Sequence, residues 1–266
     1  MENIISFPNL GMEFKVSRVA FSVFGTEIYW YGLIIVFGLL LAFLYAVCEA
    51  KKTDVSQDDL LNLFILCVPS AVVGARLYYV LFSFSDYKNN LLEIFNIRGG
   101  GLAIYGGIIA TALAIICYCK VKKLKKGKIF DILAVGLLIG QAIGRWGNFV
   151  NGEAFGSKTD SLFAMKIISD GVLTANMVHP TFLYESVWNF FGIFALLVYK
   201  RRKLFCGEIF AAYMVWYGFG RMLIERLRAD SLYIGGFKVS LLVSAFILIT
   251  GIFVIVSGRK KAKLYK

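Results

Sequence analysis

Four polar residues near the end of one apolar run have the spacing of a single helix face. Tyr217, Arg221, Glu225 and Arg228 follow one another at intervals of four, four and three residues. At about 100° per residue, these intervals place all four on one narrow face of a helix. Arg221 and Glu225 can pair one turn apart, and Arg228 can reach Glu225 from the next turn. The pattern fits either a structural stripe of ion pairs between helices or an anion site in which a carboxylate holds an arginine.

A second polar group closes another apolar run, at residues 144–156, which read Gly-Arg-Trp-Gly-Asn-Phe-Val-Asn-Gly-Glu-Ala-Phe-Gly. Arg145 offers a planar guanidinium that suits phosphate, and Glu153 could orient this or another arginine. Asn148 and Asn151 supply neutral hydrogen bonds. An interfacial turn would explain the glycines and asparagines, but it explains the arginine beside them less well.

Further polar residues lie within or beside apolar runs. Arg76 sits inside a run, and Tyr105 lies in a stretch, Arg98–Gly107, whose glycines would let backbone and lipid approach closely. His179, the only histidine, and Glu185 stand at the start of another run. A general base is one interpretation of His179, but a histidine beside proline at a helix start is more often structural. We expect His179 and Glu185 to support the site.

The elements that position these groups are apolar runs of membrane-spanning length. Hydrophobic residues make up 59% of the 266 residues and charged residues 17%, against about half and about a quarter in soluble domains. A run of about 20 apolar residues crosses the hydrocarbon core. The sequence therefore predicts an all-α integral membrane protein, one domain over residues 1–266 with a bundle of about seven transmembrane helices. The expected spans are 28–48, 60–82, 101–119, 129–147, 180–199, 208–226 and 237–257.

Four basic clusters follow the first, third, fifth and seventh spans and therefore lie on one side of the membrane. They are Lys51–Lys52, Lys120–Lys128, Lys200–Lys203 and Arg259–Lys266. The positive-inside rule makes this side cytoplasmic, with the N-terminus outside and the C-terminus inside. Most of the polar groups then lie near the outer face, where we expect residues 148–178 to form a small irregular cap. Because the clusters fall between apolar runs, nucleic acid is not an expected partner.

Residues 144–156 resemble the signature of bacterial prolipoprotein diacylglyceryl transferases. The resemblance continues in chain order through Trp30–Gly32, Gly99–Gly107, His179–Glu185 and Gly220–Arg228, and so covers nearly the whole chain. It implies transfer of the sn-1,2-diacylglyceryl group from phosphatidylglycerol to the lipobox cysteine of preprolipoproteins. The products would be a thioether-linked lipoprotein precursor and glycerol 1-phosphate, at the outer face of the bacterial cytoplasmic membrane.

The family's functional residues carry over onto matching positions of this sequence. The resemblance implies functional roles for Tyr31, Arg145, Asn148, Glu153, Gly156, Arg221 and Glu225, with Tyr217 and Arg228 as supporting residues. Two arginines could bind the lipid phosphate and stabilise the charge that develops on it. The reaction needs no metal or cofactor, and the five cysteines and one histidine form no clustered ligand set with carboxylates.

One position departs from the family pattern. Many members have a histidine, proposed as a catalytic base, where this chain has Tyr105. A phenol with a reference pKa of about 10 is a poor base near neutral pH. We therefore expect Tyr105 to contribute a hydrogen bond at the reacting centre.

Three other classes of function remain open on the residues alone. A transporter or channel for an anionic lipid or solute would also place arginines inside a bundle, but not gathered at one face. A different lipid-headgroup transferase that depends on a metal would carry an Asp-rich motif, which is absent. A retinal-type receptor would need a central lysine in the last span, and residues 237–257 lack one.

Overall fold

The computed structural model describes residues 2–88, 90–97, 100–229, 231 and 233–264. Arg98 and Gly99 of the glycine-rich stretch lie outside the described residues. The chain divides into two compact units, Met1–Tyr45 with Phe130–Lys266 and Ala46–Ile129.

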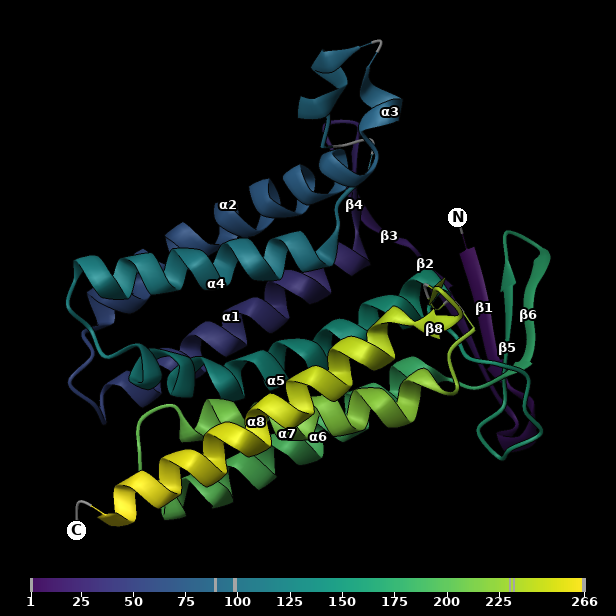
Figure 1. Cartoon of the computed structure of the whole chain (residues 1–266). Helices are drawn as coiled ribbons and strands as arrows, with labels where there is room; N and C mark the ends of the chain where they lie inside the picture. Colours follow the sequence, from purple (N-terminus) through teal and green to yellow (C-terminus); the bar gives the residue numbers. More distant parts are fainter. Residues whose placement is uncertain (1, 89, 98–99, 230, 232, 265–266) are drawn as a thin grey trace. The chain divides into compact units, whose positions relative to one another are not determined.

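Within the described residues, six helices are long and apolar enough to cross a membrane. They are α1 (Trp30–Ala50), α2 (Gln57–Phe82), α4 (Ile104–Val121), α5 (Lys126–Asn151), α6 (Thr181–Tyr199, continued by a 3-10 turn at Lys200–Arg202) and α8 (Val239–Leu264) (Figure 1). A further helix, α7 (Glu208–Glu225), matches the sixth expected span but carries three charged residues and falls outside this set. The prediction of a mainly helical membrane protein is confirmed.

The unit Ala46–Ile129 is built on a close crossing of α2 and α4. A Cβ atom on Gly106 would overlap the carbonyl oxygen of Gly74, and one on Gly74 would overlap the side chain of Ala110. Small residues allow two membrane helices to approach this closely. Gly107 likewise faces α2, because its Cβ would lie 3.1 Å from the Ala71 carbonyl oxygen. The expectation that these glycines let backbone approach closely is confirmed, and the backbone that approaches Gly106 and Gly107 is that of α2.

Arg76 of α2 holds the segment that joins α2 to α4, which contains α3 (Phe84–Tyr87) and the 3-10 turn Leu91–Phe95. Its Nε donates to the carbonyl oxygen of Ile94 at 2.8 Å, and Nη2 donates to that of Glu93 at 2.5 Å. Nη1 donates to the carbonyl of Gly100 at 2.9 Å. Arg76 is therefore a structural residue that caps backbone carbonyls.

In the other unit, α7 packs along α8 and against α6 (Figure 1). Apolar side chains of α5, α6 and α7 form a buried core of Ala134, Val135, Leu138, Leu196, Ile209 and Tyr213. This core fixes α5, α6 and α7 against one another. It thereby fixes the polar side chains at their ends.

The end of this core near the start of α7 holds the buried carboxylate of Glu208. Arg259 Nε of α8 donates to Glu208 Oε1 at 2.6 Å, and the Tyr199 hydroxyl donates to the same oxygen at 2.9 Å. The backbone N–H of Leu204 donates to Oε2 at 2.6 Å. Glu208 thus ties α8 and the end of α6 to the start of α7.

Asp131 of α5 completes this arrangement. It accepts hydrogen bonds from the backbone N–H groups of Gly207 at 2.8 Å and Phe210 at 3.0 Å, and it pairs with Lys203 at 2.9 Å. A carboxylate at a helix N-terminus satisfies free N–H groups and complements the helix dipole. We call the side chains of Asp131, Tyr199, Lys203, Glu208 and Arg259 the Glu208 cluster.

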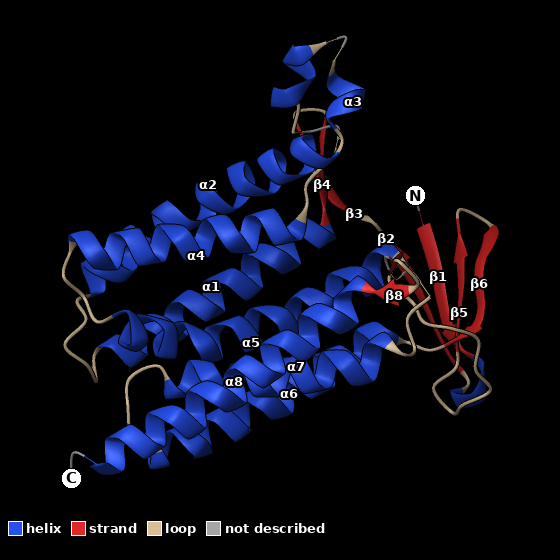
Figure 2. Ribbon diagram, in the orientation of Figure 1, coloured by secondary structure: helices blue, strands red, loops and turns tan. Residues whose placement is uncertain are grey.

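The same unit contains a four-stranded antiparallel sheet with the order β2-β1-β5-β6 (Figure 2). Its strands are β1 (Glu2–Phe7), β2 (Met12–Ser17), β5 (Met165–Ser169) and β6 (Val172–Val178). Two short hairpins, β3 (Val19–Val23) with β4 (Thr26–Tyr29) and β7 (Tyr233–Ile234) with β8 (Phe237–Lys238), add the remaining strands.

Residues 148–178 are more regular than expected. The helix α5 continues to Asn151, four residues beyond the expected end at 147, and β5 and β6 follow. Asp170 and Gly171 both have positive φ, which is the conformation that favours a tight hairpin turn. The expectation of an irregular segment holds for residues 152–164, which contain no helix or strand, and is wrong for residues 165–178. These residues are regular because β5 pairs both with β6 and with β1 near the N-terminus.

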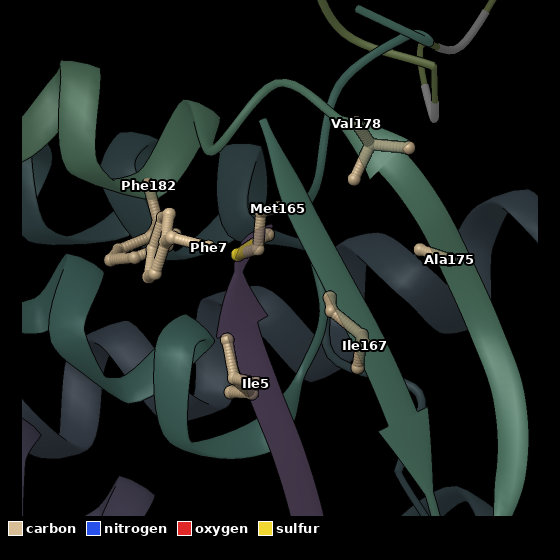
Figure 3. Packing of buried hydrophobic residues seen from close by; sticks show 7 residues of the cluster. All are labelled: Ile5, Phe7, Met165, Ile167, Ala175, Val178 and Phe182. Atoms are coloured by element: carbon tan, nitrogen blue, oxygen red, sulfur yellow. The ribbon is translucent and has the colours of Figure 1, made fainter. Parts of the chain in front are cut away.

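The sheet packs on the first turn of α6. Ile5 and Phe7 of β1, Met165 and Ile167 of β5 and Phe182 of α6 belong to one buried cluster, in which Phe7 and Met165 lie near Phe182 (Figure 3). A polar contact joins β1 to α5, since the Asn3 side-chain amide donates to the carbonyl oxygen of Val150 at 2.8 Å. The sheet therefore supports the end of α5 and the start of α6, where the candidate site lies.

Candidate active site

The site begins with an ion pair between α5 and α6. Arg145 lies near the C-terminal end of α5, and its Nη2 is 2.5 Å from Oε2 of Glu185 in α6. Its Nη1 donates to Oδ1 of Asn148 at 3.2 Å. Because α5 continues to Asn151, Arg145 and Asn148 lie one turn apart on a rigid helix.

The α7 arginines converge on the same carboxylate. Arg221 Nη1 is 2.6 Å from Oε1 of Glu185, and Arg228 Nη1 is 3.2 Å from it. Arg221 Nη2 is also 2.7 Å from Oε2 of Glu225, which is fully buried. Three guanidiniums thus surround one carboxylate whose side chain is only 6% exposed. We call Arg145, Glu185, Arg221, Glu225 and Arg228 the Glu185 cluster.

The expected pairing of Arg221 with Glu225 is confirmed, and Arg228 has an additional partner. The helix α7 ends at Glu225, so Arg228 lies in the turn beyond it, where its backbone forms a bridge with Gly156. Its side chain returns to Glu185. Lys238 closes the end of α7 by donating to the carbonyl oxygens of Glu225 at 2.8 Å and Arg228 at 3.1 Å.

Glu153 holds the side-chain amides of two asparagines. Its Oε1 accepts hydrogen bonds from the side-chain amides of Asn148 and Asn151, both at 3.1 Å. Asn148 in turn accepts from Arg145. Glu153 therefore reaches an arginine through Asn148, whereas the carboxylate that holds Arg145 directly is Glu185.

Gly156 lies where three segments of the chain meet. Its N–H donates to the carbonyl oxygen of His179 at 2.8 Å, and a Cβ at this position would lie 2.6 Å from the Leu227 carbonyl oxygen. The next residue, Ser157, donates its N–H to Leu227 at 2.6 Å. The absence of a side chain at Gly156 has a packing reason, and its role in substrate binding stays a prediction.

His179 and the tyrosines lie around the cluster. The Nδ1 atom of His179 is 3.3 Å from the Tyr184 hydroxyl, and its backbone holds Gly156. The ring of Tyr31 in α1 lies against Gly147. A Cβ atom added at Gly147 would lie 2.8 Å from this ring. Tyr217 stacks on Tyr213 with ring centroids 5.8 Å apart.

Tyr105 belongs to the other compact unit. It lies in the first turn of α4 and is half-buried. Its expected hydrogen bond at the reacting centre stays a prediction.

The central place of Glu185 exceeds what the sequence suggested. We expected a supporting residue, and the structure gives it three arginine partners on two other segments. One signal was available: Glu185 is the sole ionisable residue of residues 181–199 apart from tyrosines. An ionisable group alone in an apolar run requires a partner.

The cluster has one positive charge in excess, since three arginines face two carboxylates. Arg145 is 27% exposed, Arg221 14% and Arg228 11%, so the guanidiniums line the accessible side and the carboxylates lie behind them. Such an arrangement suits a phosphate, which accepts paired hydrogen bonds from guanidinium groups.

Comparison with known proteins identifies the family. The sequence model of the prolipoprotein diacylglyceryl transferases matches residues 18–257. The chain belongs to this family. A phosphatidylglycerol–prolipoprotein diacylglyceryl transferase of Finegoldia magna is 49% identical over 248 residues, which are 92% of this chain and 97% of the relative.

Two further relatives have the same name. The transferase of Clostridioides difficile is 44% identical over 249 residues, covering 93% of this chain and 98% of the relative. That of Clostridium botulinum (strain Langeland) is 44% identical over 254 residues, covering 94% and 100%. The resemblance seen in residues 144–156 therefore extends to nearly the full length of these prolipoprotein diacylglyceryl transferases.

Proposed function

We propose that this chain transfers the diacylglyceryl group of phosphatidylglycerol to the thiol of a prolipoprotein cysteine, the first step of lipoprotein maturation. The acceptor is the lipobox cysteine at the end of a signal peptide, and the released product is glycerol 1-phosphate. The observation that carries the proposal is the convergence of Arg145, Arg221 and Arg228 on the buried carboxylate of Glu185. Membership of the family supports it.

Arg145 and Arg221 bind the lipid phosphate. Each is held by a carboxylate, so their planar groups are fixed before the lipid arrives. Fixed cations stabilise developing charge most strongly where water is scarce. Asn148 binds the phosphate or the glycerol, with Glu153 holding its amide.

The reaction forms the S–C bond of the thioether and breaks the thiol S–H bond and the C–O bond between glycerol and phosphate. The thiol proton passes to water or to the released phosphate monoester, and the thiolate attacks the glycerol carbon that carries the phosphate. The carbon–oxygen bond breaks, and its electron pair goes to the phosphate oxygen. The extra negative charge develops beside Arg145 and Arg221, which stabilise the leaving group.

The remaining residues support this step. Tyr31 and Tyr105 contribute hydrogen bonds at the reacting centre, and Gly156 keeps the substrate side of the site narrow. Glu225 holds Arg221. Arg228 helps to hold Glu185, and Tyr217 and His179 support the cluster. All belong to one catalytic domain.

A direct assay tests the activity. Purified protein is incubated with phosphatidylglycerol and a lipobox peptide, and thioether product and glycerol phosphate are measured. We expect one glycerol phosphate for each thioether. Lipid movement across vesicles without thioether formation would instead indicate a transporter.

The site faces the outside of the cytoplasmic membrane. The Glu185 cluster lies at the ends of α6 and α7 opposite Lys200–Lys203 and Arg259, which the positive-inside rule places in the cytoplasm. A cysteine introduced at Ser157 should react with an external thiol reagent, and one at Lys123 should not. The opposite labelling pattern would overturn this orientation.

Tyr105 can be tested separately. If it only donates a hydrogen bond, Tyr105→Phe lowers turnover without moving the pH optimum, because no titrating group is lost. Tyr105→His should stay partly active. The measurement is the pH–rate profile of each variant. If the basic limb of this profile shifts by several pH units in the His variant, residue 105 is the proton acceptor.

A further inference from the structure

Two tryptophans join α6 and α7 by a reciprocal pair of hydrogen bonds. The indole N–H of Trp188 donates to the carbonyl oxygen of Trp216 at 3.1 Å, and that of Trp216 donates to the carbonyl oxygen of Trp188 at 3.1 Å. The two rings stack with centroids 4.7 Å apart and planes 24° apart. Each helix therefore gives and receives the same contact.

A glycine receives each indole. Gly220 lies four residues after Trp216, and a Cβ on it would overlap the indole nitrogen of Trp188. Gly192 lies four residues after Trp188, and a Cβ on it would lie 2.7 Å from Cδ1 of Trp216. The same Trp-x-x-x-Gly pattern thus occurs on both helices. We call these four residues the tryptophan clasp.

The clasp lies directly beside the Glu185 cluster. Gly220 immediately precedes Arg221 in α7, and Trp188 follows Glu185 by three residues in α6. A slip of one residue along a helix moves a side chain by about 1.5 Å and turns it by about 100°. Such a slip would break the 2.6 Å contact between Arg221 and Glu185.

The apolar core shared by α5, α6 and α7 packs these helices together, but apolar contacts alone do not select one register. Lipid tails are as apolar as leucine, so burial of apolar side chains does not hold membrane helices in one alignment. On α6, the side chains of Val187, Phe190, Phe191 and Phe194 are all exposed. Directional hydrogen bonds and a close fit of ring against glycine permit one alignment only.

We infer that Trp188 and Trp216 are positioning residues that set the register of Glu185 against Arg221. They act through the two helices and do not touch the substrate. The inference rests on the proposed role of Arg221 at the lipid phosphate.

Gly220→Ala is the primary test, with Gly218→Ala as its matched control. Gly218 lies on the same helix but faces α8, where its Cβ would lie 2.8 Å from the Ser244 carbonyl oxygen. Both changes overpack a helix contact. In the phosphatidylglycerol and lipobox peptide assay, Gly220→Ala should lower kcat at least about tenfold per folded enzyme, because overpacking moves the backbone. Gly218→Ala should lower thermal stability and keep kcat within about twofold, since α8 carries no residue of the Glu185 cluster. Equal losses of kcat would overturn the inference.

A compensating change separates register from general damage. Trp188→Leu removes the indole that the new methyl group of Gly220→Ala would strike. The double variant Gly220→Ala with Trp188→Leu should therefore have about the kcat of Trp188→Leu alone, because the clash is relieved and the loss of the indole is common to both. A double variant with a clearly lower kcat than Trp188→Leu contradicts the clasp.

If the Gly220→Ala protein does not insert into the membrane, Trp188→Phe is measured in its place. It loses one hydrogen bond without a clash and should lower kcat about fivefold with KM for phosphatidylglycerol little changed. Unchanged kcat would overturn the inference. Arg221→Lys distinguishes the underlying site: an active Arg221→Lys enzyme would disprove the role of Arg221, whereas an inactive one beside a normal Gly220→Ala enzyme would disprove only the clasp.

Discussion

The Glu185 cluster and the Glu208 cluster lie at opposite ends of α6 and α7, and they use buried carboxylates for different purposes. In the Glu208 cluster, two carboxylates face two cations, Lys203 and Arg259. Backbone N–H groups at the start of α7 complete the arrangement. In the Glu185 cluster, three arginines face two carboxylates and present their guanidiniums to the accessible side.

The difference separates a structural network from a binding site on the same pair of helices. A buried ion pair must be balanced and hydrogen-bonded to be tolerated, and the Glu208 cluster meets both conditions within the protein. The residues that define the Glu185 cluster are three arginines and two carboxylates. In the proposed function the lipid phosphate binds there, so substitutions in the two clusters should differ in their effect on activity.

The largest effect is expected for Glu185→Gln. Loss of this carboxylate leaves three guanidiniums without their common partner, so the arginines proposed to bind the phosphate are no longer held in place. kcat should fall by up to roughly a thousandfold, the upper range for loss of preorganised charge at a reacting centre. The transferase assay at saturating lipid measures it. Glu208→Gln is the control, which should lower thermal stability and leave kcat nearly unchanged. If Glu208→Gln proves equally inactive while still folded, the division between the two clusters does not hold.

Arg145→Lys should have the next largest effect. The charge remains, but the planar two-pronged contact to phosphate is lost, and kcat should fall about a hundredfold, as for loss of one fixed donor to a developing anion. Arg259→Lys is the same substitution in the Glu208 cluster and should keep near-normal turnover. Near-normal turnover of Arg145→Lys would mean that this arginine is only an anchor.

Arg259→Gln should affect stability alone. Glu208 loses its cation from α8 but keeps the Tyr199 hydroxyl and the Leu204 N–H. We expect the melting temperature to fall by about 3–6 °C, the shift that a loss of one or two kcal/mol gives in a chain of this size. Thermal unfolding in detergent measures it. A fall in kcat at temperatures where the variant is fully folded would indicate coupling between the two ends.

The smallest effect is expected at an exposed pair, Asp54 with Lys128, whose atoms are 2.5 Å apart. The hydrogen bond from Lys128 lowers the pKa of the Asp54 carboxyl below its ordinary value. A carboxyl with a lowered folded-state pKa contributes stability above its unfolded pKa of about 3.9 and loses it as pH falls through the folded value. Asp54→Asn should therefore lower the melting temperature by at most about 1 °C at pH 7. The difference from the unaltered protein should vanish once the pH falls below the lowered folded-state pKa of Asp54, and a larger effect at low pH than at neutral pH would contradict this.

The sequence predicted the helices because each is a long apolar run, and it predicted the Arg221–Glu225 pair because that pair is local to one helix. The strands were not predictable in the same way. β1 pairs with β5 across about 160 residues. The local sequence of neither strand identifies the other as its partner.

The contacts of Glu185 were not predictable for a related reason. Its partners Arg145 and Arg221 lie 40 and 36 residues away, on helices whose packing sets the distance. For Arg76, the sequence suggested more than the structure shows. Its position in an apolar run suggested a functional arginine, but its partners are carbonyl oxygens, which every sequence possesses.

The pairing of β1 with β5 has a consequence for biosynthesis. The ribosome completes β1 long before β5, and at about 5–20 residues per second the interval is on the order of ten seconds or more. Until β5 is made, β1 can pair only with β2, and an isolated two-stranded hairpin is marginally stable. Asn3 can hold the end of α5 only after α5 has inserted, and the sheet can close only after β5 has emerged. Weakening β1 would therefore leave membrane insertion intact and delay the appearance of activity in newly made protein.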